Sequence, residues 1–137
     1  MASTTTAISS PTRLGSSLRK VTVGVGLLAA VVTTAVAAAV HAAGVSFEID
    51  GEMIPLLAFA QMVFLGAVIG GLLAGLFDKH SAHPRRRFLQ VTAALTVLSC
   101  VPSVALPPAA ATKLGLVFAH LVAAAIVVPV LARRLAD

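Results

Sequence analysis

The sequence predicts an all-α membrane protein: a four-transmembrane-helix bundle with a short extracytoplasmic β-hairpin between helices 1 and 2. The first observation is composition, since 58% of the 137 residues are apolar, 11% are charged and the mean hydropathy is +1.01. Soluble domains are about one quarter charged. The second is that four apolar stretches each reach the roughly 20 residues needed to cross a bilayer. The third is that the basic residues fall almost entirely on one side of these stretches.

The N-terminal region contains a tail followed by the first span. Residues 1–18 are rich in Ser and Thr and are interrupted by Pro11 and Gly15. They predict a disordered cytoplasmic tail, because they carry too little apolar surface to offset the entropy of ordering. Residues 19–137 form the transmembrane domain, beginning with an uncharged stretch over residues 21–43. A secretory signal peptide is the alternative, but its apolar region is only about 7–15 residues long.

Prolines and polar connectors separate the other three spans. These spans are expected over residues 55–77, 86–106 and 113–132. Pro55 suits the first position of a helix, where its missing N–H costs nothing, and Pro84 is expected to open the third helix. The Pro107-Pro108 pair ends that helix, because neither residue can continue it. Thr112 is expected to be the N-cap of the fourth helix.

The basic residues predict the orientation. If both termini are cytoplasmic, nine of the ten Lys and Arg residues share that side: Arg13, Arg19, Lys20, Lys79, Arg85, Arg86, Arg87, Arg133 and Arg134. Only Lys113 lies on the other side. Because cytoplasmic loops concentrate Lys and Arg, we expect a multi-pass protein of the cell (plasma) membrane with cytoplasmic N- and C-termini. The arginine run over residues 85–87 would also attract anionic lipid headgroups. The expected partner is therefore the lipid bilayer and not nucleic acid.

The stretch FEIDGEMIP, residues 47–55, lies between the first two spans. Its Asp-Gly step between alternating residues favours a type I′ two-residue turn. That register places Glu48 opposite Met53, and Ile49 opposite Glu52. Phe47 then faces Ile54. Since an isolated two-stranded hairpin is marginally stable in water, Phe47 and Ile54 are expected to rest on the helix ends or on the loop at residues 107–108.

A calcium site is the alternative reading of the same stretch. Its ligands would be Glu48, Asp50 and Glu52. Strand alternation sends Glu52 to the face away from Glu48, and three carboxylates leave the 6–8 oxygen ligands of calcium incomplete. The sequence therefore favours a connector with solvent-facing acids.

The second span carries glycines at helical spacing. Gly66 and Gly70 are four residues apart, as are Gly71 and Gly75. Small residues let membrane helices approach closely, so these glycines predict a packing face. Packing within the bundle is one interpretation, and a homo-oligomer interface is the other. The GxxxG spacing alone does not decide between them.

Several polar residues lie at membrane depth: Thr33, Thr34, His41, Gln61, Thr92, Thr96, Ser99, Cys100, Ser103 and His120. At 1.5 Å of rise per residue, Gln61 and His120 both lie roughly 10 Å below the outer surface. We expect an intramembrane polar cluster of Gln61, His120, Ser99 and Cys100, in which an amide and an imidazole satisfy each other. A structural hydrogen bond is one role for the cluster. A small polar pocket open to the outer face is the other.

The last span resembles a known family. The stretch ATKLGLVFAHLVAAAIVVPVLARRL is similar to the last helix of a family of small four-span membrane proteins of unknown function, common in actinobacteria. The similarity lies in a Lys before the helix, a His-Leu-Val step and a Pro one to two turns before an Arg, here at Lys113, His120, Leu121, Val122, Pro129 and Arg133. The resemblance implies four spans and an inner-membrane location. It implies no activity.

The residues point to a non-enzymatic packing or interaction component of the cell membrane. No HExxH, P-loop or paired intramembrane aspartates occur in the sequence, so no catalytic residue, cofactor or metal ligand is expected. His80 and His83 have HxxH spacing but no third ligand beyond Asp78. The partner is expected to be a second copy or another membrane protein. The alternative is a small homo-oligomeric transporter or channel with its polar path at the level of Gln61 and His120.

Overall fold

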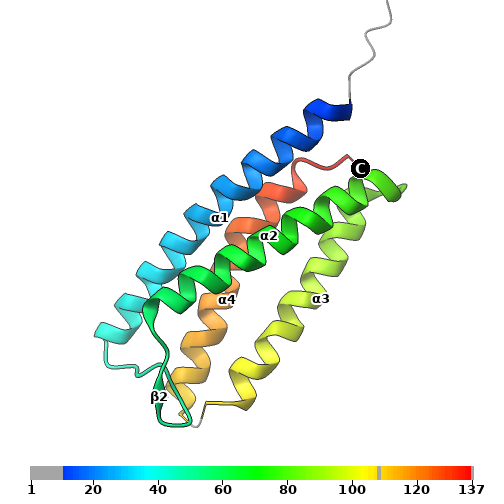
Figure 1. Cartoon of the computed structure of the whole chain (residues 1–137). Helices are drawn as coiled ribbons and strands as arrows, with labels where there is room; N and C mark the ends of the chain where they lie inside the picture. Colours follow the sequence, from blue (N-terminus) through cyan, green and yellow to red (C-terminus); the bar gives the residue numbers. More distant parts are fainter. Residues whose placement is uncertain (1–10, 108, 137) are drawn as a thin grey trace, which may run out of the picture.

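A computed structural model describes residues 11–107 and 109–136 of the chain, with side chains from residue 15 onward. These residues form four helices, α1 (Pro11–Ala42), α2 (Leu56–His80), α3 (Pro84–Ala105) and α4 (Ala110–Ala132). A hairpin of β1 (Glu48–Ile49) and β2 (Glu52–Met53) lies between α1 and α2 (Figure 1). All four helices are long and apolar enough to cross a membrane. The predicted four-helix membrane fold with a hairpin is therefore confirmed.

The helix boundaries follow the predicted spans closely except at the start of α1. The bounds of α2, α3 and α4 lie within three residues of those expected. By contrast, α1 begins at Pro11, inside the stretch expected to be a disordered tail; residues 1–10 lie outside the described residues. A proline is tolerated in the first turn of a helix because that N–H has no partner there. At 32 residues, α1 is about 48 Å long and exceeds the ~30 Å hydrocarbon core.

The two ends of the bundle differ in charge. The start of α1, the α2–α3 connector and the end of α4 lie together at one end (Figure 1). The hairpin and the α3–α4 connector lie at the other end. Arg19, Lys79, Arg86 and Arg134 are exposed at the first end. The second end carries the acidic hairpin, with Asp50 and Glu52 exposed.

A row of small residues joins α1 to α2, the two helices in most extensive contact. On α2 the row consists of Ala67, Gly71 and Gly75, four residues apart. It meets Gly26, Thr22 and Leu18 of α1, in that order. A Cβ at Gly26 would lie 3.0 Å from the Cβ of Ala67, and one at Gly75 would lie 3.7 Å from the Leu18 side chain. This spacing supports packing within the bundle for Gly71 and Gly75.

The other two predicted packing glycines behave differently. Gly70 is buried and faces α4, where a Cβ would lie 3.3 Å from Leu131. Gly66 is exposed, and a Cβ there would meet no atom within 4 Å. A methyl group at Gly66 would therefore contact no other helix among the described residues.

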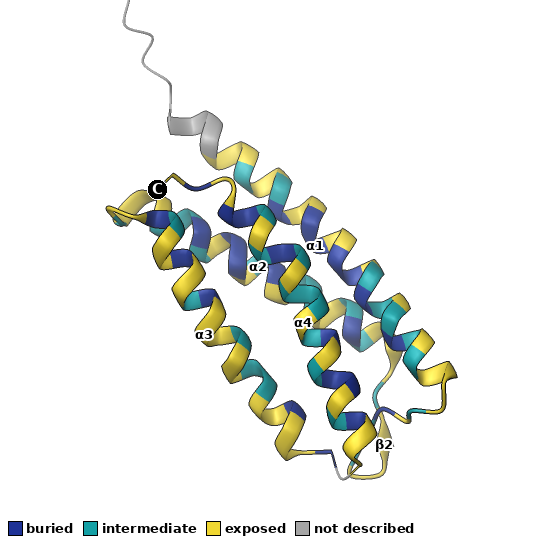
Figure 2. Cartoon of the chain, turned by 180° about the vertical axis from the view of Figure 1, so that it is seen from behind, coloured by how far each residue is buried: buried dark blue, intermediate teal, exposed yellow. Residues whose placement is uncertain are grey.

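The buried apolar residues form two clusters along the bundle. The cluster at the basic end includes Val25, Ala74, Phe88 and Leu131, and the cluster at the hairpin end includes Ala37, Phe47, Phe59 and Leu116. Figure 2 shows buried residues along the inward sides of α1, α2 and α4, while α3 exposes most of its length. The core is consequently least complete beside α3.

The hairpin has the predicted register. Glu48 pairs with Met53, Ile49 pairs with Glu52, and the Ile54 amide donates to the Phe47 carbonyl at 2.7 Å. Asp50 has φ of 53° and Gly51 has φ of 84°. Positive φ at both central residues is the signature of a type I′ turn.

The hairpin is fixed to the helices by Phe47 and by a hydrogen bond from α4. The Phe47 ring packs edge-on against Phe59 with ring centroids 5.0 Å apart. The Thr112 hydroxyl donates to the Ser46 carbonyl at 2.5 Å. The expectation that Thr112 caps α4 was wrong, because the helix begins at Ala110 with Ala109 as N-cap. The Thr112 hydroxyl instead holds the chain entering the hairpin.

Candidate functional site: a lateral cavity in the bundle

The principal cavity among the described residues lies between the two apolar clusters and borders both. Its volume is about 510 Å³, within the ~300–1,000 Å³ usual for ligand pockets. Along α2 the lining extends from Phe59 to Leu73, which corresponds to roughly 21 Å at the rise of an α-helix. The lining therefore extends over more than half of the ~30 Å hydrocarbon core.

The mouth of the cavity is apolar. The exposed lining side chains are Met62 and Ile69 on α2, and Leu95 and Leu98 on α3. Exposed Gly66 lies between Met62 and Ile69 and adds no side chain to this rim. The lining residues of α4 are all buried or half-buried. In a bilayer the mouth therefore opens sideways between α2 and α3, toward acyl chains.

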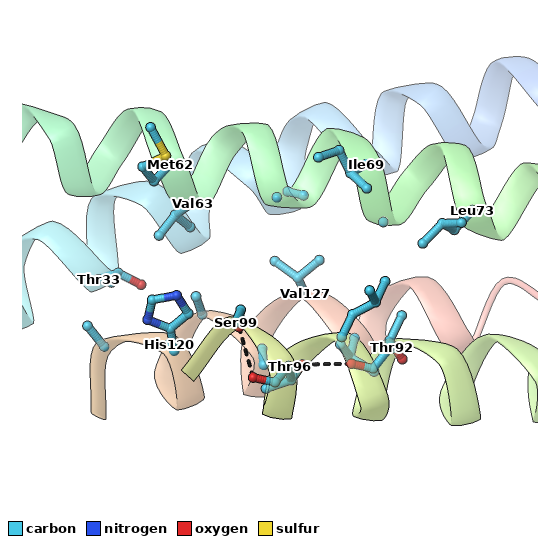
Figure 3. Close-up of a pocket in the computed structure, with 18 of the residues that line it drawn as sticks. Thr33, Met62, Val63, Ile69, Leu73, Thr92, Thr96, Ser99, His120 and Val127 are labelled. Atoms are coloured by element: carbon cyan, nitrogen blue, oxygen red, sulfur yellow. Dashed lines mark hydrogen bonds between the residues drawn. The ribbon is translucent and has the colours of Figure 1, made fainter. Parts of the chain in front are cut away.

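The wall contributed by α3 carries hydroxyl groups that are already bonded to their own helix. Thr92 donates to the Phe88 carbonyl at 2.8 Å, Thr96 to the Thr92 carbonyl at 2.8 Å, and Ser99 to the Thr96 carbonyl at 2.8 Å. Figure 3 shows this row beneath the cavity, facing Met62, Ile69 and Leu73 of α2. Hydroxyl bonding to a preceding carbonyl is a common way to satisfy these groups in a helix.

Thr33 and His120 form the polar part of the lining near the hairpin end. Thr33 on α1 is 0% exposed and lines the cavity, and its Oγ1 atom has no hydrogen-bond partner among the described residues. His120 on α4 is half-buried, with Nδ1 3.0 Å from the Leu116 carbonyl oxygen. In Figure 3 the oxygen of Thr33 points toward the ring of His120. We call these two side chains the polar pair.

The structure brings together only part of the predicted polar cluster. His120 and Ser99 line the same cavity, whereas Gln61 and Cys100 do not. Gln61 is exposed on α2, so the expectation that it faces the bundle interior beside His120 was wrong. Cys100 is half-buried on α3. Gln61 lies on the side of α2 that also exposes Leu57 and Leu65, one turn before and one turn after it.

Sequence reasoning did not single out Thr33 or the apolar mouth. The signal available for Thr33 was its depth in the first span, which it shares with Thr34. Thr34 is also without a hydrogen-bond partner but does not line the cavity. Only the rotation of α1 in the bundle separates the two. The hairpin acids Glu48, Asp50 and Glu52 form no group that could hold a metal among the described residues.

The chain was compared with protein families, curated proteins and solved structures. The model of a family described as "Family of unknown function (DUF6069)" matches residues 13–137. No curated protein and no solved structure matches the chain. The expected resemblance to a family of unknown function is confirmed. What the cavity can bind is therefore inferred from the residues that line it.

Proposed function

The chain belongs to the DUF6069 family of unknown function, and from its cavity we propose that it is an integral membrane protein that binds an apolar molecule taken from the bilayer. The observation that carries this proposal is the lateral cavity of about 510 Å³. Its mouth is rimmed by exposed Met62, Ile69, Leu95 and Leu98. A molecule dissolved among acyl chains enters such a mouth without crossing a polar barrier.

The lining supports binding without catalysis or ion conduction. None of the residues lining the cavity is Asp, Glu, Lys, Arg or Cys. Ser99 and His120 both line the cavity, but the Ser99 hydroxyl donates to the Thr96 carbonyl at 2.8 Å and His120 bonds to its own helix. A nucleophile and its base need to lie within hydrogen-bond reach of each other. Ion pathways through membranes are generally marked by ionisable residues, which favours binding over the channel alternative.

Gly66 provides the test of this function. Leu in place of Gly66 fills open space at the mouth, so we expect Gly66→Leu to weaken binding of oleyl alcohol roughly tenfold, a change of about 1.4 kcal/mol. The measurement is native mass spectrometry of the delipidated full chain in detergent, titrated with oleyl alcohol.

The matched control is Gly24→Leu. Gly24 is also an exposed helical glycine with no atom near its Cβ position, but it lies on α1 outside the cavity. Both substitutions remove a helical glycine and gain the same helix propensity. Equal affinity of the two variants for oleyl alcohol would contradict entry through the proposed mouth.

Self-association is a second proposal, supported by the exposed Gln61. Gln61 lies six residues past Pro55, roughly 9 Å further along the helix axis, on a side exposed between Leu57 and Leu65. An amide has both donors and acceptors, so the amides of two copies complement each other, and such bonds associate helices in lipid. The same native mass spectra report the dimer; a wholly monomeric protein in lipid nanodiscs would exclude it.

The charges at the two ends support a location in the cell membrane with both termini cytoplasmic. Exposed Arg86 and Arg87 line a pocket at the basic end together with His83 and Gln90. Under the positive-inside rule this end is cytoplasmic, where anionic headgroups meet basic side chains. The test uses a protease and a tag on either terminus. We expect the protease to cleave the tag in inverted membrane vesicles and not in intact cells.

A further inference from the structure

We propose that the polar pair of Thr33 and His120 makes the cavity selective for a neutral lipid with a free hydroxyl group, such as a long-chain alcohol or an acylglycerol. This inference rests on the proposed function and specifies its ligand. Both residues line the cavity near its hairpin end, one from α1 and one from α4. The rest of the lining is apolar apart from the satisfied hydroxyls of α3.

The state of the Thr33 hydroxyl is the first observation. Thr22, Thr92 and Thr96 each donate to the carbonyl four residues earlier at 2.8 Å. Thr33 makes no such bond, although it is 0% exposed. Burying a hydroxyl without a hydrogen bond is costly, and such a group in a native structure calls for a specific explanation. A ligand atom in the cavity that accepts its proton supplies one.

The hydrogen bond of His120 is the second observation. A carbonyl oxygen only accepts, so Nδ1 of His120 donates its proton to the Leu116 carbonyl. In the neutral imidazole the other nitrogen, Nε2, is then an acceptor. Nε2 has no partner among the described residues that could donate to it. His120 thereby offers an acceptor, and Thr33 offers a donor, at the same end of the cavity.

A hydroxyl group complements this pair. Its O–H donates to Nε2 of His120, while its oxygen accepts from Oγ1 of Thr33. A hydrocarbon satisfies neither group, and an ester offers no donor. A carboxylate brings a charge into a lining that contains no Lys or Arg, which is costly at membrane depth. The rest of the cavity, whose whole lining extends roughly 21 Å along α2, accommodates the chain that carries the hydroxyl.

The experiment compares three ligands with 18 carbon atoms that carry a hydroxyl group, a carboxylate or no polar head. Native mass spectrometry of the delipidated full chain is titrated with oleyl alcohol, 1-octadecene and oleate. We expect the wild-type protein to bind oleyl alcohol about tenfold more tightly than 1-octadecene, as two hydrogen bonds at a buried site allow. Oleate is expected to bind no better than 1-octadecene at pH 8.

Substitutions of Thr33 and His120 test whether the polar pair causes the preference for oleyl alcohol over 1-octadecene. Thr33→Val and His120→Leu are each expected to bring the affinity for oleyl alcohol to within about threefold of that for 1-octadecene. Thr34→Val is the matched control, since it removes a buried, unpartnered hydroxyl of the adjacent residue outside the cavity. It is expected to keep the wild-type preference. Should His120→Leu fail to fold, Thr33→Val carries the test.

The outcomes separate this inference from the function on which it rests. Equal affinity of the wild-type protein for oleyl alcohol and 1-octadecene overturns the hydroxyl selectivity and leaves lipid binding standing. Binding of neither probe overturns both. Loss of the preference in Thr34→Val overturns its assignment to Thr33. A dimer that carries no bound probe would mean that a second copy of the chain occupies the cavity. That result overturns the inference.

Discussion

Gly71→Ala is expected to force α1 away from α2 and to lower the free energy of unfolding by about 3 kcal/mol. A Cβ at Gly71 would overlap the Oγ1 and Cγ2 atoms of Thr22 and lie 2.9 Å from its Cβ. Thr22 cannot turn aside freely, because its hydroxyl donates to the Leu18 carbonyl at 2.8 Å. Protein interiors are close-packed and absorb added volume poorly. Unfolding in mixed detergent micelles, followed by circular dichroism, measures the change.

Gly75→Ala is the control for this prediction. It adds the same methyl group one turn further along the same row, at 3.7 Å from the Leu18 side chain, an ordinary contact. It should match or exceed the wild-type stability, because alanine has the higher helix propensity. Thr22→Ala should partly rescue Gly71→Ala, because it removes Oγ1 and Cγ2 and keeps only the Cβ atom of Thr22. If Gly71→Ala proves as stable as Gly75→Ala, the close approach of α1 and α2 at this point is wrong.

The spans and the hairpin could be predicted because their signals are local. A stretch of about 20 apolar residues without charge indicates a transmembrane helix. Pro84 begins α3, as expected. The Asp50-Gly51 step favours a type I′ turn, whose twist matches that of the strands. A two-residue turn at these positions places Ile49 opposite Glu52. Each of these inferences depends on residues within a few positions of one another.

The site could not be predicted, because it depends on how each helix is rotated in the bundle. A membrane helix is apolar on all sides, so its sequence lacks the polar face that marks the outside of a soluble helix. Of the predicted cluster, His120 and Ser99 line the same cavity. Depth along the helix did not show that Gln61 faces outward while Thr33 faces the cavity. The glycines illustrate the same limit, since Gly66 and Gly70 share a spacing but only Gly70 packs on a helix.

Phe47 joins the hairpin to the helices. Phe47→Ala is expected to lower the free energy of unfolding by about 3 kcal/mol or more. The ring is 2% exposed, packs edge-on against Phe59, and lies where a Cβ on Gly115 would be 2.8 Å from its Cε1. Its removal leaves a cavity at the core of the hairpin-end cluster. Unfolding in mixed micelles measures the loss.

The local effect of Phe47→Ala distinguishes anchoring from general destabilisation. Two-stranded hairpins are marginal on their own, so without the ring the strands should separate from the helices before the bundle unfolds. Hydrogen exchange at the Ile54 amide, which donates to the Phe47 carbonyl at 2.7 Å, should then accelerate more than exchange in α2. Met53→Ala is the control, because Met53 lies in the same hairpin but is 62% exposed. Unchanged protection of Ile54 in Phe47→Ala would mean that the Thr112 hydrogen bond to Ser46, and not the buried ring, holds the hairpin on the bundle.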